Sequence, residues 1–495
     1  CYVVVSEMAK NKTGKKKIVV ASILAALAIQ TAGVIDVAAA PGDKPSAAIA
    51  DGTVTSGKTN GLAIGNFASS ESHQSIAIGY YSVANAAEAN PALPATAVGA
   101  GAQAKGQSTV ALGLKALAEA DSATALGSKT SATGDKSVAV GISAAATADS
   151  ATALGSKTSA TGDRSVAVGI SAEAKGRYAS TLGAEASAVG NATAVGAKSI
   201  ASQDAAVAVG TDSKATGNYA SALGAEATAS GNDSTAFGHG TVASGASSTA
   251  LGSRAKTGSV AGVGIGMLAN ATNQYGVAIG GESSSTADNS IAIGRKSSVT
   301  GENGIAIGTF TTSKGANGVA VGTNGTTAEL GGVAVGQAAK SNKFYSVAMG
   351  MNVTADGDNS VALGGSASAN SEGTIAIGSY GSTPTKATGN RALAIGSATT
   401  ANGLESIAIG SRVNSTSQHS IAIGTGSNAS AVKSVAIGPD SRATVDGGVA
   451  LGRDSVADVA GGATNKGYNP NTNRTDNYSG LTGNVLTSTT GAVSI

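Results

Sequence analysis

Residues 52–59 read GTVTSGKT and match the phosphate-binding loop pattern, with Gly52, Gly57, Lys58 and Thr59 at the required positions. Such a loop binds phosphate when a strand precedes it and a helix follows, because the first N–H groups of the helix then face the anion. Here the match lies in a Gly/Ser/Thr-rich stretch and runs directly into NGLAIG, whose alternating pattern predicts a strand. We therefore expect no nucleotide site.

Other residues with catalytic or metal-binding chemistry are few and widely spaced. His73, His239 and His419 are separated by 166 and 180 residues, so one chain of stacked repeats cannot bring them to one metal, although a trimer would gather three copies of one histidine. ADGDN at 355–359 is similar to calcium-binding turns, but the fourteen-residue period described below differs from their nine and favours a solvated turn. The single cysteine is Cys1, and no Ser/His/Asp grouping recurs. We expect no catalytic residue, no metal, no cofactor and hence no enzyme.

The composition excludes a set of ordinary globular cores. The 495 residues include 71 Gly, no Trp and four Phe, and aromatic residues make up only 3% of the chain. The hydrophobic share of 41% is carried largely by Ala, which buries little area, so large side chains are too few to fill several thick cores. A thin core that is repeated many times remains possible.

One tetrad, apolar-Ala-apolar-Gly with small variations, recurs along the chain in 28 copies. Of the 27 intervals between its glycines, 24 are fourteen residues long, and the exceptions are 20, 13 and 18. Small residues also recur three and five positions after each glycine, so each unit predicts strand, corner, strand, corner, as in a parallel β-roll of stacked coils. The tetrad glycines are residues 65, 79, 99, 113, 127, 141, 155, 169, 183, 196, 210, 224, 238, 252, 266, 280, 294, 308, 322, 336, 350, 364, 378, 396, 410, 424, 438 and 452.

Alternation within the tetrad assigns its residues to two faces of a strand. We expect the large apolar residues on either side of the central Ala to form the core of the roll. They include Ile76, Ile78, Val138, Val140, Val166, Val168, Ile291, Ile293, Ile407, Ile409, Ile421 and Ile423. The central alanines then form a smooth stripe on the other face, where another chain packs or, alternatively, water lies. They include Ala77, Ala139, Ala167, Ala292, Ala408 and Ala422.

The first forty residues predict a secretory signal. Five lysines between positions 10 and 17 precede the apolar run IVVASILAALAIQTAGVIDVAAA, and Ala38 and Ala40 suit a cleavage before Pro41. Gln30 and Asp36 interrupt the run, which argues against a retained membrane-spanning helix. Beyond residue 40 the chain holds 27 basic and 28 acidic residues, so it has no electrostatic footprint for nucleic acid. Because the sequence starts at Cys rather than Met, we expect its true N-terminus to lie upstream.

These SVAIG- and SIAIG-type tetrads resemble the head repeats of trimeric autotransporter adhesins, the type found in the Yersinia adhesin head. The resemblance covers residues 61–456 and implies an all-β, left-handed parallel β-roll of about 28 coils with three identical chains side by side. By the same resemblance, residues 1–40 contain the end of an extended signal region, while the composition of residues 41–60 indicates a Gly/Ser/Thr-rich leader. Residues 457–495 are similar to the start of a head-to-stalk connector, but they lack the tryptophan usual there. The stalk and the C-terminal membrane anchor of the family are not found in this sequence, which suggests a fragment or a secreted relative.

Two longer intervals are candidate ligand loops, because extra residues in a stacked repeat bulge from a corner, where binding residues concentrate. One lies in YYSVANAAEANPALPA and the other in YGSTPTKATG. Their candidate contact residues are Tyr80, Tyr81, Asn90, Leu93, Tyr380 and Lys386. The alternative is an insertion with no role.

The resemblance implies an exported bacterial surface head that binds matrix proteins, cell surfaces or sister molecules through many weak contacts, whose avidity exceeds each single affinity. A spacer rod without a ligand is the main alternative. An ice- or mineral-binding solenoid would need a regular Thr or Asp ladder, and a β-helix acyltransferase would need a six-residue period that is absent.

Overall fold

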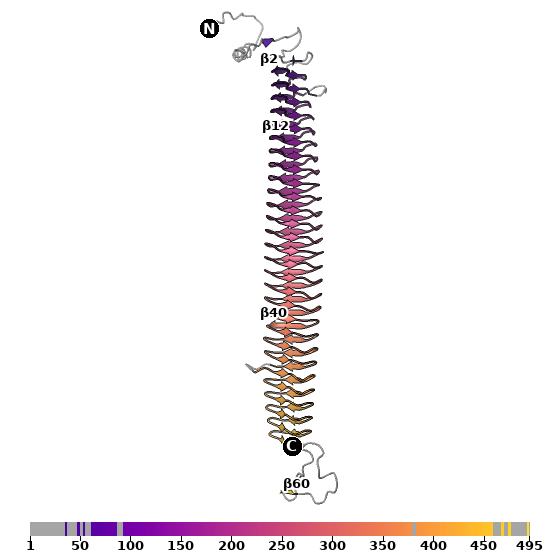
Figure 1. Ribbon diagram of the computed structural model, residues 1–495, viewed down its shortest axis with the longest axis vertical. Helices are drawn as coiled ribbons and strands as arrows, with labels where there is room; N and C mark the ends of the chain where they lie inside the picture. The colour runs from indigo at the N-terminus through magenta and orange to yellow at the C-terminus, as the bar shows by residue number, and fades with distance from the viewer. Residues whose placement is uncertain are drawn as a thin grey trace, which may run out of the picture. The chain divides into compact units, whose positions relative to one another are not determined.

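The computed structural model describes residues 61–86, 93–378 and 383–458 in full (Figure 1). It also describes six short strands outside these ranges: β1 (Ile35–Asp36), β2 (Ala47–Ile49), β3 (Thr53–Val54), β60 (Gly467–Asn469), β61 (Arg474–Asp476) and β62 (Val493–Ser494). Apart from these strands, the expected signal, leader and connector lie outside the described residues. The chain divides into two units, Cys1–Ala205 and Ala206–Ile495, which are described separately.

Every regular element among the described residues of both units is a β-strand, and each coil contributes two. The even-numbered strands, β4 (Leu62–Ile64) to β22 (Thr193–Val195) in unit 1 and β24 (Val207–Val209) to β58 (Val449–Leu451) in unit 2, occupy the three residues before each tetrad glycine. Only β40 (Val319–Thr323) and β42 (Val333–Gln337) run two residues further. The expected β-roll of about 28 fourteen-residue coils is thereby confirmed.

The odd-numbered strands are two residues long and begin four residues after the tetrad glycine, from β5 (Ser69–Ser70) to β23 (Ile200–Ala201) and from β25 (Lys214–Ala215) to β59 (Val456–Ala457). Two deviate: β41 (Thr327–Ala328) begins one residue later, and β49 (Lys386–Ala387) follows the longer interval. In each unit the even and odd strands form two separate parallel sheets.

Successive coils pair in register, so equivalent residues of the repeat stack directly on one another. In unit 1, β12 (Thr124–Leu126) pairs with β14 (Val138–Val140), which places Ala125 opposite Ala139. In unit 2, Ile291 pairs with Ile305 and Ala292 with Ala306. A one-residue slip would exchange the inner and outer faces of every strand, so the strict period fixes this register.

The face assignment made from the sequence is wrong, because the alanines lie inside the coil. Ala77, Ala139, Ala167, Ala292, Ala408 and Ala422 are all completely buried within the single chain. The large residues on either side of them point outward and are half-buried, with Val166 more exposed. This correction applies to Ile76, Ile78, Val138, Val140, Val166, Val168, Ile291, Ile293, Ile407, Ile409, Ile421 and Ile423.

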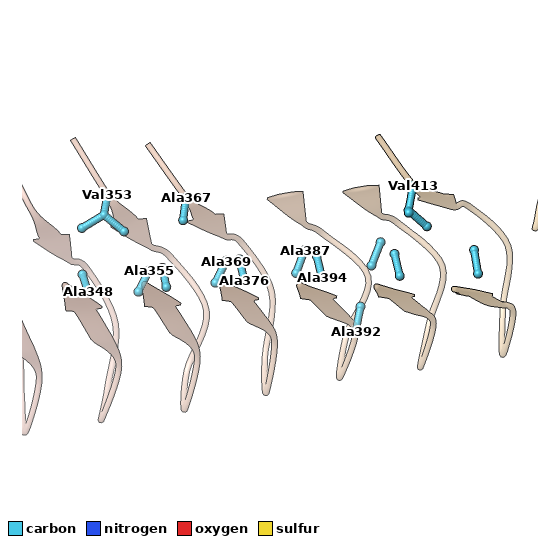
Figure 2. Close-up of a cluster of buried hydrophobic side chains, with 14 of the residues drawn as sticks. Ala348, Val353, Ala355, Ala367, Ala369, Ala376, Ala387, Ala392, Ala394 and Val413 are labelled. Atoms are coloured by element: carbon cyan, nitrogen blue, oxygen red, sulfur yellow. The ribbon is translucent and has the colours of Figure 1, made fainter. Parts of the chain in front are cut away.

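The thin interior explains the reversal. The largest fully buried side chains are valines and threonines such as Val299, Val353 and Thr109, and nearly all other core residues are Ala or Ser. Figure 2 shows Ala369 of β47 (Ser368–Ala369) and Ala376 of β48 (Ile375–Ile377) meeting between the two strand layers. Two layers so close together have no room for isoleucine, because overpacking forces backbone shifts.

Strands outside the fully described ranges extend the sheets. β2 pairs in parallel with β4, and β3 pairs with β5, so these two strands lie within the expected leader. In unit 2, β62 pairs in parallel with β58 and covers the last even strand. Among the residues described, no helix is long and apolar enough to cross a membrane.

Candidate functional site

Three aromatic side chains gather on one corner of unit 1. Phe67 lies on the corner between β4 and β5, while Tyr80 and Tyr81 lie on the equivalent corner of the next coil, between β6 (Ile76–Ile78) and β7 (Val83–Ala84). The fourteen-residue period places Phe67 and Tyr81 at the same position of successive coils, and the Tyr81 N–H donates to the carbonyl oxygen of Asn66 at 3.0 Å. We call Phe67, Tyr80 and Tyr81 the aromatic corner.

The rings of the aromatic corner pack against each other and remain open to solvent. Phe67 and Tyr81 are stacked, with centroids 4.6 Å apart and planes 19° apart, and Tyr80 meets both edge-on. Each of the three residues is at least 50% exposed. Desolvation beside the other rings raises the pKa of Tyr80 above its ordinary value, and the charge and hydroxyl of Tyr81 raise it further. The hydroxyl of Tyr80 is therefore protonated at neutral pH, and the corner exposes phenol hydroxyls at the ring edges together with apolar ring faces.

Gly101 occupies the same corner position one coil beyond Tyr81. A β-carbon placed on Gly101 would lie 3.4 Å from Cγ of Lys115 and would have no atom of Tyr81 within 4 Å. Within the described part of unit 1, every other residue at this position has a side chain. The ring face of Tyr81 that points away from Phe67 is consequently not covered by a neighbouring side chain at this position. We call this space the Gly101 gap.

The candidate ligand residues predicted from sequence do not form one group. Tyr80 and Tyr81 are together and exposed, but exposed Leu93 lies on the other corner, between β7 and β8 (Thr96–Val98). Lys386 is exposed in unit 2, at the start of β49. Asn90 and Tyr380 lie outside the described residues. Sequence reasoning missed Phe67, although counting back one period from Tyr81 would have found it.

A second surface is formed by the first and third residues of the even strands, which we call the aliphatic face. In unit 2, from β32 (Val263–Ile265) to β58, both positions are Val, Ile, Leu or Met in every coil. These side chains are half-buried or exposed, as with Ile307 at 39% and Met349 at 43%. In unit 1 the face is less apolar, because hydroxyl residues such as Thr124, Thr152 and Ser180 take the first position.

Charged residues on the corners serve the stacking of coils. Carboxylate oxygens accept hydrogen bonds from backbone N–H groups one coil earlier, as Asp149 does from Asp135 at 3.1 Å and Asp288 from Gln274 at 3.1 Å. Glu405 pairs with Arg391 at 2.7 Å and with His419 at 3.2 Å. Within the part of the chain that the structure describes, no three His, Cys, Asp or Glu residues are grouped to hold a metal ion.

The phosphate-loop match at 52–59 contains a strand. Thr53 and Val54 form β3, which pairs in parallel with Ser69 and Ser70 of β5. Backbone groups of Thr53 and Val54 that pair within a sheet are not free to wrap a phosphate. The rest of the match lies outside the described residues.

Two comparisons with known proteins give matches. The model of the YadA head domain repeat (2 copies) matches 330 of the 495 residues, at 57–82, 94–186, 190–255, 271–297, 300–324, 355–380, 387–412 and 415–455. The crystal structure of the collagen-binding domain of Yersinia adhesin YadA is similar at 33% identity, over 28% of this chain and 69% of that chain, with a TM-score of 0.23. No curated protein matches.

The coils, their register and their exposed corners define a parallel β-solenoid head built from one repeated unit. The family match covers about two thirds of the chain, and the chain belongs to the family of YadA head domain repeats. The resemblance to trimeric autotransporter adhesin heads, inferred from the tetrads, is confirmed by this family match.

Proposed function

We propose that this chain is the head of a surface adhesin that works as a homotrimer and binds without catalysis. The aliphatic face of unit 2 carries the proposal, because fourteen successive coils present branched or long apolar residues that a single chain leaves partly exposed. Monomeric proteins rarely expose an apolar surface of such extent. Two further copies of the same chain cover it, since a repeat in register offers the same surface at every coil.

In this proposal the interface differs from the one expected from sequence. The central alanines are already buried inside each coil, so the stripe that meets other chains consists of residues such as Ile407, Ile409, Ile421 and Ile423. Each Å² of apolar surface that this face buries between chains would stabilise the assembly by about 25 cal/mol, repeated along many coils. The corners and the outer side of the odd strands remain free for ligands.

The ligands we propose are matrix proteins, cell surfaces or sister molecules, bound by an exported head on a bacterial surface. Many nearly identical coils in three chains give weak contacts a high effective concentration. The similar Yersinia structure is described as a collagen-binding domain, which makes collagen the first matrix protein to test. A rod that only spaces other parts from the cell would bind none of these.

The first experiment is the solution mass of the purified full chain, by light scattering after size exclusion, with circular dichroism on the same peak. A β-rich trimer supports the proposal, whereas a stable β-rich monomer contradicts the aliphatic interface. Binding of the trimer to immobilised collagen and fibronectin, with albumin as the control surface, then separates an adhesin from a spacer. Absence of binding and of self-aggregation would favour the spacer.

A further inference from the structure

The aromatic corner is the one place among the described residues where aromatic rings contact each other. Cations lie over other exposed rings, namely Arg164 and Arg177 over Tyr178 and Arg295 and Lys296 over Phe310, but over no ring of the aromatic corner. Each of its three rings is at least 50% exposed, and among the described residues no cation lies over any of them. Their free faces are available to a ligand.

The backbone at this corner favours small or polar residues rather than rings. Phe67 and Tyr81 have φ values of 60° and 54°, in the left-handed region that Gly and Asn enter most readily. Elsewhere in unit 1 the same position is held by residues such as Lys129, Ser143 and Ser171. Single rings also occupy left-handed backbone in other coils, as at Tyr275 and Phe310, but among the described residues only Phe67 and Tyr81 follow one another in successive coils and stack.

The chemistry of the corner distinguishes a sugar from a peptide. Three backbone N–H groups that could pair with a peptide strand are already used: that of Tyr81 donates to the carbonyl oxygen of Asn66, that of Gly101 to the carbonyl oxygen of Tyr80 at 2.7 Å, and that of Ser82 to the carbonyl oxygen of Gly79. Three rings are also far smaller than the roughly 800 Å² per partner of a stable protein interface. What remains are aromatic faces with phenol hydroxyls at their edges.

We propose that the aromatic corner binds a pyranose ring of a glycan, with the sugar seated on Tyr81 in the Gly101 gap. The C–H face of a pyranose is attracted to the negative face of an aromatic ring, and its hydroxyls pair with phenol hydroxyls, which both donate and accept. Phe67 supports the Tyr81 ring from behind by stacking, and Tyr80 stands edge-on to both. This inference rests on the proposed adhesin function, for which it names a ligand class. The three rings belong to one chain, so the site itself does not require the trimer.

The test measures saturation-transfer NMR signals of lactose and N,N′-diacetylchitobiose on the purified full chain and its variants. Tyr81→Ser removes the platform, and serine is already accommodated at this corner at positions 143 and 171. Tyr275→Ser is its control, because Tyr275 is an exposed tyrosine on left-handed backbone with no ring contact among the described residues. We expect about tenfold weaker binding for Tyr81→Ser, the loss of one aromatic contact, and no change for the control.

A second variant fills the gap and leaves all three rings in place. Gly101→Asn suits a φ of 67° and puts a side chain in the gap, where its β-carbon would contact Cγ of Lys115 at 3.4 Å. Gly240→Asn is the matched control, since Gly240 has a φ of 63° and meets only Cγ of Arg254, at 3.5 Å. The proposal requires Gly101→Asn to abolish the sugar signal and Gly240→Asn to keep it.

No signal with either disaccharide overturns the proposal, as does a signal that survives in both Tyr81→Ser and Gly101→Asn. Self-association of the chain that Tyr81→Ser abolishes, without sugar binding, identifies a second copy as the occupant and also overturns it. Light scattering of the same samples reports the trimer independently. A monomer that binds sugar contradicts only the trimeric head, and a trimer that does not bind sugar contradicts only the glycan site.

Discussion

Gly294 and Gly308 lie one above the other in successive coils, so close that a β-carbon added to Gly294 would be 2.4 Å from the carbonyl oxygen of Gly308. Gly294 also has a φ of 124°, which side chains rarely adopt. The tetrad glycine is therefore required by both the turn and the close approach of the next coil. This is why the tetrad recurs with glycine at its end.

Substitution of Gly294 by Ala should open the coils around it. The added methyl group meets backbone that cannot move without displacing the next coil, and we expect a local loss of about 2 kcal/mol or more. Amide hydrogen exchange across residues 280–308 measures it, because unfolding of a repeat array is local. Gly281→Ala is the control, since a β-carbon there meets only an oxygen of Met267 at 4.0 Å. Equal protection in the two variants would contradict the clash.

A buried serine without a partner should be dispensable. The Ser137 hydroxyl is buried and has no hydrogen-bond partner, whereas Ser234, at the same corner position, donates to the carbonyl oxygen of Gly231 at 2.6 Å. We expect Ser137→Ala to leave local stability unchanged or raise it, and Ser234→Ala to lower it by about 1 kcal/mol. Exchange of the surrounding amides compares them. A larger loss for Ser137→Ala would mean that its hydroxyl is satisfied.

Titration of Tyr80 should depend on its neighbour. Desolvation raises its pKa above 10.0, and the charge and hydrogen bond of Tyr81 raise it further. Because the folded chain favours the neutral phenol, this contribution to stability is full below pH 10 and is lost as the pH rises through the raised pKa. Tyr81→Phe removes two of the three causes, so we expect the pKa of Tyr80 to fall, as measured by NMR of ¹³C-labelled tyrosine. An unchanged value would exclude contact between the two hydroxyls.

Period and composition were sufficient to predict the coils, their number and the positions of both strands. Alternation alone did not show which face of a strand is inside, because it separates two faces without labelling them. The usual rule places Ile inside and Ala outside, and here it is wrong since the space between the two layers fits only small residues such as Ala292. Tyr80 and Tyr81 were found as exposed aromatic residues. Phe67 and the Gly101 gap could be found only once it was known which residues of successive coils lie next to each other.

The interior position of Ala292 can be tested by enlarging it. Ala292, Val299 and Ala306 form one buried cluster, so the additional carbons of Ala292→Leu have no space and should disrupt the coil. We expect loss of amide protection in residues 291–307 and a lower melting temperature. Ile291→Leu, on the outward side of the same strand, is the control and should melt close to the unchanged chain. If Ala292→Leu were tolerated, the alanine would face outward after all.

Charge on the aliphatic face should separate the chains without unfolding them. Ile291 and Ile293 point outward, so aspartates there remain hydrated in a single chain but are buried and unpaired in a trimer, which is strongly unfavourable. We expect the double variant Ile291→Asp, Ile293→Asp to lose trimer mass, at least partly, and to keep its β-type circular dichroism. Ser298→Asp with Thr300→Asp adds the same charge to the outer side of the odd strand in this coil and should remain trimeric. If the Ser298→Asp, Thr300→Asp variant lost the trimer and the Ile291→Asp, Ile293→Asp variant kept it, the interface would lie on the odd strands. The reason is that only the face buried between chains is sensitive to added charge.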